Sequence, residues 1–200
     1  MHAFAQLLDA LIYTRGRNAK LKLIVDYLHA TPDPDRGWAM AALTGDLDLP
    51  AVKPALIRAL IESRVDPVLF RMSRDYVGDT AETVALLWQG PEHGDEALSL
   101  DQVVEALSTV SRARAPDLLA GLLDRLDANG RYALLKFATG ALRVGVSARL
   151  AKTAFAEAFG VTVEDVEEVW HALRPPFTDL FAWGEGRAER PDLGDRKSVV

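Results

Sequence analysis

Apolar residues recur with helical spacing along almost the whole chain, and this periodicity limits the fold more than any other feature. Near the start, Phe4, Leu7, Leu8 and Leu11 follow the i, i+3, i+4, i+7 spacing that gathers side chains on one face of an α-helix. Short groups of Gly, Pro, Asp and Asn interrupt similar segments as far as residue 173. We find no strand hairpin and no fixed repeat. The sequence therefore predicts an all-α fold, a compact multi-helix domain of about eleven or twelve helices.

Capping residues locate several of the helix ends. The segment Ser99–Gln102 has the pattern of a capping box, and Gly45 suits the C-terminal end of a helix over 36–44. An aspartate within 31–35 is expected to cap the start of that helix, with a proline at an early helical position. The Asn-Gly pair at 129–130 is expected to form a turn between two helices.

The helical pattern weakens toward the C-terminus, and this change suggests a domain boundary. We assign residues 1–183 to one helical domain and residues 184–200 to a linker or disordered tail, because the latter are polar and lack periodicity.

The start of the chain resembles a helix more than a signal peptide, and no run of apolar residues is long enough to span a membrane. We therefore expect a cytoplasmic protein.

Candidate catalytic groups are scarce in this sequence. There are 200 residues and no cysteine, which excludes a disulfide framework and cysteine-based metal sites. The four histidines are scattered without metal-ligand spacing, and neither a phosphate-binding P-loop nor a nucleophile elbow is present. We predict no catalytic, metal or cofactor site in this chain.

Positive charge is sorted along the chain, although the formal net charge is −6. Segment 15–22 holds four cations, segment 131–152 holds five, and neither contains an acidic residue. In the first segment a helix–helix turn carries Gly16, which allows a close backbone approach, and Asn18, which is expected to cap the next helix. The predicted DNA-binding residues of this segment are Arg15, Gly16, Arg17, Asn18 and Lys20.

The second basic segment is a short break between two apolar helical patterns. Gly140 is expected to end one helix and Ser147 to cap the next, while Gly145 permits a positive φ. Two cations three residues apart are expected to share the exposed face of the second helix. The predicted DNA-binding residues here are Arg143, Gly145, Ser147, Arg149 and Lys152. Helix starts, glycines and cations together suit contact with phosphate groups.

Each basic segment also has an ordinary structural explanation, as a solvated turn or as a pair of capped helix ends. The absence of acidic residues over 23 positions favours phosphate contact for the second segment. The broader alternative is a helical protein–protein interaction scaffold without DNA binding, which the net acidity and the succession of helices would suit.

The order of several motifs resembles the N-terminal DNA-binding domain of ATP-dependent DNA ligases, of the bacterial type. Residues 141–150 contain L-R-V-G-V before an alanine-rich helix, and residues 14–20 read T-R-G-R-N-A-K. The segment 78–87 is similar to the G-D-x-x-E-x-x-x-L-L element of that family, and the proline-containing segment near Pro175 also fits. The likeness covers roughly residues 1–183.

This resemblance implies an all-helical domain that binds the minor groove and backbone of nicked double-stranded DNA, in support of nick sealing during DNA repair, recombination or replication. In such ligases, nucleotidyltransferase and OB-fold domains follow on the same chain and use ATP and Mg²⁺. The resemblance places the AMP-accepting lysine in a K-x-D-G motif, whereas Lys197 is followed by Ser-Val-Val. We therefore expect that these 200 residues do not seal nicks alone.

Overall fold

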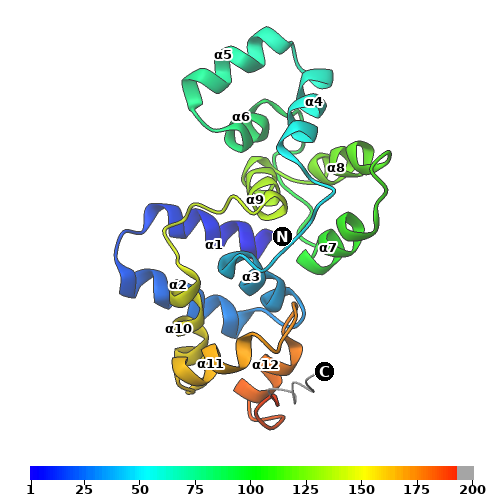
Figure 1. The fold of residues 1–200 in the computed structure, drawn as a ribbon. Coiled ribbons are helices and arrows are strands. Elements are labelled where there is room, and N and C mark those ends of the chain that lie inside the picture. The colour runs from blue at the N-terminus through cyan, green and yellow to red at the C-terminus, as the bar shows by residue number, and fades with distance from the viewer. Residues whose placement is uncertain (193–200) are drawn as a thin grey trace, which may run out of the picture. The chain divides into compact units, whose positions relative to one another are not determined.

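The computed structural model describes residues 1–192, and this part of the chain forms twelve α-helices and no strand (Figure 1). The predicted all-α fold with eleven or twelve helices is confirmed. The helices are α1 (His2–Tyr13), α2 (Arg17–Ala30), α3 (Asp35–Thr44), α4 (Pro54–Arg64), α5 (Pro67–Val77), α6 (Thr80–Leu87), α7 (Leu100–Thr109), α8 (Ala115–Asp124), α9 (Ala128–Thr139), α10 (Ala148–Phe159), α11 (Val163–Trp170) and α12 (Thr178–Gly184).

The chain folds into two compact units, each assembled from two stretches. Unit 1 comprises residues 1–12 and 48–144, and unit 2 comprises residues 13–47 and the described residues from 145 onward. The helical periodicity does not reveal this division, because it reports which face of a helix is buried and not which distant segment buries it. The basic segment 131–152 contains the boundary between Val144 and Gly145, so its two halves belong to different units.

The core of unit 1 forms around α9, which packs against α6. The rings of Phe4 in α1 and Phe137 in α9 make a T-shaped, edge-to-face contact, with centroids 5.4 Å apart. Both rings are fully buried, as are Leu134 and Leu135. The amino group of Met1 donates a buried hydrogen bond of 2.8 Å to the carbonyl oxygen of Leu98, which fixes the start of α1 within this unit.

The core of unit 2 forms around α10, which packs against α2, α3 and α11 (Figure 1). Ala151 and Ala154 are completely buried, and such small side chains let neighbouring helices approach closely. Beside them, Phe155 makes an edge contact with Phe181 of α12, with ring centroids 5.2 Å apart. Trp170 is also buried, and the centroids of its ring and of the Phe177 ring lie 4.5 Å apart.

Most of the predicted helix ends are confirmed by the backbone. The capping box of Ser99 and Gln102 is present in both directions, and Gly45 ends α3 in the left-handed conformation with φ of +80°. Gly140 ends α9 in the same way with φ of +70°. Local hydrogen bonding at these positions is strong enough to be recognised from residue types alone.

Two predicted helix boundaries are wrong. The Asn-Gly pair at 129–130 lies in the first turn of α9 and not between helices, because Asp127 accepts a 2.7 Å hydrogen bond from the backbone N–H of Gly130 and so begins the helix earlier. No aspartate caps α3, since its N-cap residue is Pro34. Asp33 instead accepts hydrogen bonds from the guanidinium of Arg36.

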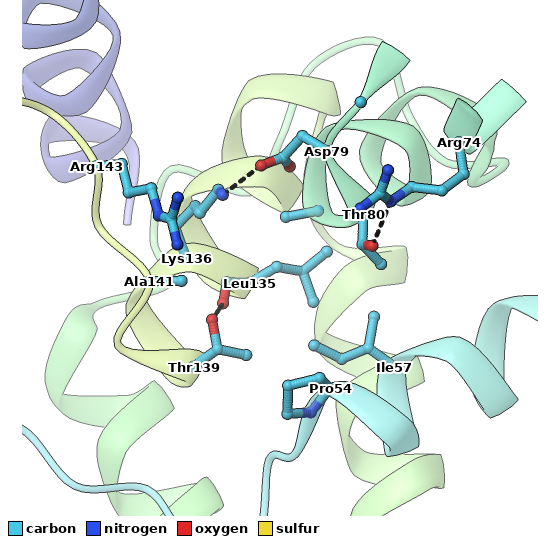
Figure 2. A pocket seen from close by; sticks show the side chains of 12 residues that line it. Pro54, Ile57, Arg74, Asp79, Thr80, Leu135, Lys136, Thr139, Ala141 and Arg143 are labelled. Atoms are coloured by element: carbon cyan, nitrogen blue, oxygen red, sulfur yellow. Dashed lines mark hydrogen bonds and ion pairs between the residues drawn. The ribbon is translucent and has the colours of Figure 1, made fainter. Parts of the chain in front are cut away.

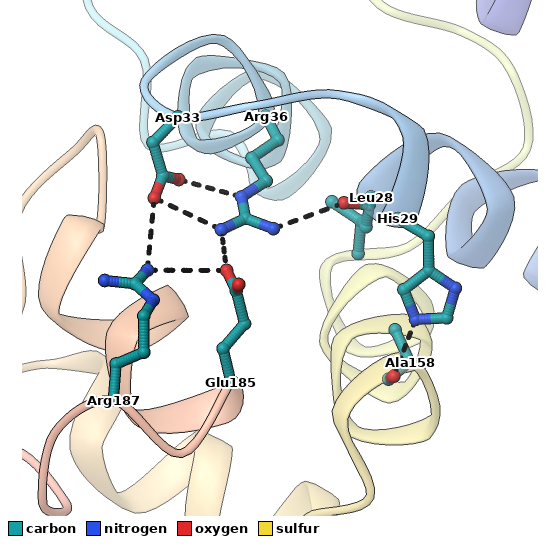
Figure 3. A network of polar contacts seen from close by, with 7 residues as sticks. All are labelled: Leu28, His29, Asp33, Arg36, Ala158, Glu185 and Arg187. Atoms are coloured by element: carbon teal, nitrogen blue, oxygen red, sulfur yellow. Dashed lines mark hydrogen bonds and ion pairs between the residues drawn. The ribbon is translucent and has the colours of Figure 1, made fainter.

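The segment after α12 contacts α3 and the turn before it through ion pairs within unit 2 (Figure 3). The buried guanidinium of Arg36 contacts both Asp33 and Glu185, and Arg187 contacts the same two carboxylates. The hydrogen bond from Arg36 holds the pKa of Glu185 below its usual value. These contacts fall within the predicted linker or tail at 184–200, of which residues 193–200, including Lys197, lie outside the described residues.

No helix in residues 1–192 combines the length and the apolar character that crossing a membrane requires.

Two helical glycines should respond in opposite ways to alanine. A Cβ at Gly37 in α3 would overlap the carbonyl oxygen of Pro176, whereas one at Gly121 in α8 would meet nothing within 4 Å. We expect Gly37→Ala to lower the free energy of unfolding by about 1–3 kcal/mol through overpacking. Gly121→Ala should raise it by about 0.5–1 kcal/mol through higher helix propensity.

Urea unfolding followed by circular dichroism would compare the two variants with the parent. Equal stability of Gly37→Ala and the parent would show that α3 does not pack closely against residue 176.

Candidate nucleic-acid interface

The basic segment 131–152 has no acidic residue of its own, but the fold brings other partners to most of its cations. Arg131 is buried, and its guanidinium donates hydrogen bonds to the carbonyl oxygens of Ala85 and Leu126. Burial lowers the pKa of Arg131, because removal from water disfavours the charged form. Arg131 thus links α9 to α6 within unit 1 and has a structural role.

Lys136 is buried as well and pairs with Asp79, at 2.6 Å between Nζ and Oδ2. The same carboxylate caps α6 by accepting a 2.8 Å hydrogen bond from the backbone N–H of Glu82. Burial alone would raise the pKa of Asp79, but the hydrogen bonds from Lys136 and Glu82 outweigh it and hold the pKa below its usual value. Asp79 therefore joins the start of α6 to the middle of α9.

The position predicted for Lys152 on an exposed helix face is wrong. Its side chain is buried, with Nζ 3.0 Å from Oε2 of Glu167 in α11 and 5.0 Å from the ring centroid of Trp170. Helical spacing placed Lys152 beside Arg149, but α11 packs over that side of α10. An ammonium in this position is already compensated by a carboxylate and an aromatic ring.

Arg149 is exposed, as predicted, with 63% of its side chain accessible. Two carboxylates of α11 lie near its guanidinium, Glu164 at 3.9 Å and Glu167 at 3.7 Å. Ion pairs this long and this exposed contribute little to stability. Arg149 can therefore turn toward an external anion, although the neighbouring acids reduce the local positive potential.

Arg143 differs from the other four cations of its segment. Its side chain is exposed and makes no hydrogen bond or ion pair with any other residue in the described range 1–192. It lies in the loop after α9 and belongs to unit 1, whereas Gly145, two residues later, belongs to unit 2. The predicted loop around Arg143 and Gly145 is thus one of the three places where the chain passes from one unit to the other.

In the other basic segment, 15–22, the start of α2 differs in one detail from the prediction. The N-cap residue is Gly16, with φ of −76°, and Asn18 is already the second residue of the helix, so its predicted capping role is wrong. No side chain caps this helix start. Arg15 and Arg17 are exposed, and neither side chain has a partner within residues 1–192.

Lys20 brings the two basic segments together within unit 2. Its Nζ lies 3.4 Å from the carbonyl oxygen of Gly145, and α2 packs along α10. Gly145 has the predicted positive φ, +68°, and a Cβ there would collide with Nζ of Lys20. Ser147 caps α10 as predicted by accepting a 3.0 Å hydrogen bond from the N–H of Leu150.

The predicted residues therefore separate into three groups. The first, close to the start of α2 or α10 in unit 2, comprises Arg15, Gly16, Arg17, Asn18, Lys20, Gly145, Ser147 and Arg149. Arg143 lies in unit 1, and Lys152 is buried in unit 2. Contact of these residues with DNA stays a prediction.

Within residues 1–192, no cluster of three or more His, Asp or Glu side chains could hold a metal ion.

Sequence reasoning missed one group of residues near Arg143. Arg74 of α5 donates a 2.8 Å hydrogen bond to Oγ1 of Thr80, and both line a pocket with Arg143, Lys136 and Asp79 (Figure 2). The sequence signal for this group of residues is the Gly-Asp-Thr segment at 78–80, which belongs to the motif at 78–87 but does not by itself indicate contact with α9.

The part of the chain that the structure describes is all-helical, and the unpaired cations of segments 15–22 and 131–152 lie at the start of α2 and in the loop between α9 and α10. Residues 1–156 match the protein family described as DNA ligase N terminus. The chain belongs to this family. A search of curated protein sequences found no match to the chain.

Replacing Asp79 tests the junction between α6 and α9. We expect Asp79→Asn to lower the free energy of unfolding near pH 7 by about 2–4 kcal/mol, because it removes the charged partner of the buried Lys136 ammonium, while asparagine can still cap α6. The lowered pKa stabilises the fold above about pH 4, the usual pKa of an unfolded aspartate. This contribution is lost as the pH falls through the pKa of folded Asp79.

Urea titrations at several pH values would measure the difference between the parent and the variant. This difference in the free energy of unfolding should become smaller below about pH 4. A double variant with Lys136→Met should lose less than the sum of the single losses, since the pair acts as a unit. Strict additivity would contradict the coupling between the two residues.

Proposed function

We propose that this chain binds nicked double-stranded DNA for an ATP-dependent DNA ligase. The observation that supports it most is the start of α2, where Arg15 and Arg17 are exposed without partners in the described residues and the backbone N–H groups have no side-chain cap. A helix start of this kind attracts anions, and two adjacent guanidinium groups add charge and hydrogen-bond donors for phosphates.

The surroundings of α2 extend this surface within unit 2. Lys20 lies beside the carbonyl of Gly145, and Ser147 begins α10 next to the exposed Arg149. Two helix starts and their cations can therefore face one sugar–phosphate backbone. No helix carries the array of Arg, Asn and Gln that reads bases in the major groove, so we infer binding to the backbone and minor groove with little sequence preference.

In this proposal the domain holds the duplex while other domains of a ligase perform the chemistry. Transfer of AMP and closure of the nick would use ATP and Mg²⁺ bound by those domains. The part played by this chain is to increase the residence time of the ligase on nicked DNA. Such a role would serve DNA repair, recombination or replication.

A protein-binding scaffold is the second candidate, and one surface favours it. Along α5 the side chains of Val68, Leu69, Met72 and Tyr76 are all at least half exposed, and Leu86 of α6 extends the same apolar surface. Exposed apolar patches of this kind mark protein contacts in many proteins.

A gel shift with nicked DNA at low and moderate salt separates the two candidates, because a pure scaffold would show no salt-dependent shift.

Removing the two unpaired arginines of α2 tests the proposed DNA surface. We expect Arg15→Ala with Arg17→Ala to weaken binding of nicked duplex by about tenfold at about 0.1 M salt and to reduce the salt slope by about two, because two phosphate contacts are lost. Fluorescence anisotropy across a salt series would measure both quantities.

Lys22→Ala is the matched control for this measurement. Lys22 is also exposed on α2, but it already pairs with Asp26 at 2.7 Å, so its removal should change DNA affinity much less. Equal effects of Lys22→Ala and the double variant would show that general charge, and not the helix start, determines binding.

A further inference from the structure

Unit 1 contains a pocket of about 320 Å³ between α4, α5, α6, α9 and the loop after α9 (Figure 2). Its floor is apolar and consists of the exposed ring of Pro54 together with the buried side chains of Ile57 and Leu135. Polar side chains surround the floor, with Arg143 on the side of the loop and Arg74 on the side of α5. Gly78, at φ of +82°, adds no side chain that would fill the opening.

The charged groups of the pocket leave an excess of positive charge. Arg74, Lys136 and Arg143 contribute three cations, and Asp79 is the one carboxylate among the lining residues. The hydrogen bond from Nε of Arg74 to Thr80 orients its guanidinium and leaves its terminal NH₂ groups without a hydrogen-bond partner in the described residues, although the charge of Arg74 helps to lower the pKa of Asp79. Arg143 has no partner there either. Two guanidinium groups are therefore available at one pocket, while Lys136 remains held by Asp79.

This combination of groups indicates the chemistry of the ligand. Guanidinium groups bind phosphate oxygens through paired hydrogen bonds. An apolar floor beside them suits the carbon face of a sugar ring, since ligand pockets commonly combine apolar walls with a few oriented polar groups. A bare inorganic anion would leave that floor uncovered.

We propose that this pocket binds a phosphate group together with its attached deoxyribose. Arg143 and Arg74 contact the phosphate oxygens from opposite sides, and the sugar lies over the exposed ring of Pro54. Two sources share this chemistry, a phosphodiester of duplex DNA and a free deoxynucleotide. The assignment to duplex DNA rests on the proposed function, whereas the pocket chemistry does not. In either case Arg74 becomes a ligand-binding residue in unit 1, separate from the surface on α2.

An NMR titration of the isotopically labelled 200-residue chain tests the proposal. The probes are a short nicked duplex, deoxyadenosine monophosphate and inorganic phosphate. We expect the duplex to shift the backbone amide signals of Thr80, Ala81 and Ala141, which line the pocket. The monophosphate should shift the same signals at higher concentration, and inorganic phosphate should shift them less.

Three variants accompany the titration. Arg74→Gln should weaken duplex binding by about three- to tenfold and lower the salt slope by about one. Ala141→Glu adds a carboxylate at the pocket without removing any side-chain hydrogen bond, so it should weaken binding even if Arg74→Gln impairs folding. Arg71→Gln removes an exposed cation of α5 that lies outside the pocket. The affinity of this variant for the duplex should match that of the parent.

The outcomes separate this proposal from the proposed function. Shifts at residues 15–20 with the duplex, but none at the pocket with any probe, would overturn the pocket and keep the DNA surface. Pocket shifts with the monophosphate, without any duplex binding, would support the pocket as a nucleotide site and overturn the DNA-binding function. Equal weakening by Arg74→Gln and Arg71→Gln, with Ala141→Glu binding like the parent, would also overturn the pocket.

Discussion

Charge compensation in the interior is the constraint on which the basic segments of this protein depend. A buried ammonium group is stable only when a carboxylate or several hydrogen-bond acceptors replace its lost water. Asp79 meets this requirement for Lys136 in unit 1, and Glu167 meets it for Lys152 in unit 2. Asp79 caps α6 and Glu167 lies in α11, both outside the basic segment, so two of the five cations of segment 131–152 form neutral pairs in the fold.

This compensation determines which cations remain available to contact the phosphate groups of a nucleic acid. Of the nine cations in segments 15–22 and 131–152, three side chains, those of Arg15, Arg17 and Arg143, have no partner within residues 1–192. Arg15 and Arg17 lie at the start of α2, and Arg143 lies in the loop between α9 and α10. The membership of the DNA ligase N-terminal family and the position of these three side chains lead to the same proposal, a backbone-binding domain.

Most local features of the fold could be predicted from the sequence, although the starts of α2, α3 and α9 were not, whereas contacts between distant helices could not be predicted. Ser147, Gly140 and Gly145 behave as predicted, because caps and positive φ values depend on residue type and nearest neighbours. Lys152 and the division into two units were missed, since each depends on which distant segment packs against a helix.

The most direct test of the account is the salt dependence of nicked-duplex binding by the unmodified chain. If three unpaired cations and one or two neighbours carry the contact, a plot of log K against log salt should have a slope of about −3 to −5. A slope near −8 would mean that about nine phosphates are neutralised, which is more than the unpaired cations of the two segments and one or two neighbours can supply, and it would contradict this account. A slope of zero would contradict DNA binding itself.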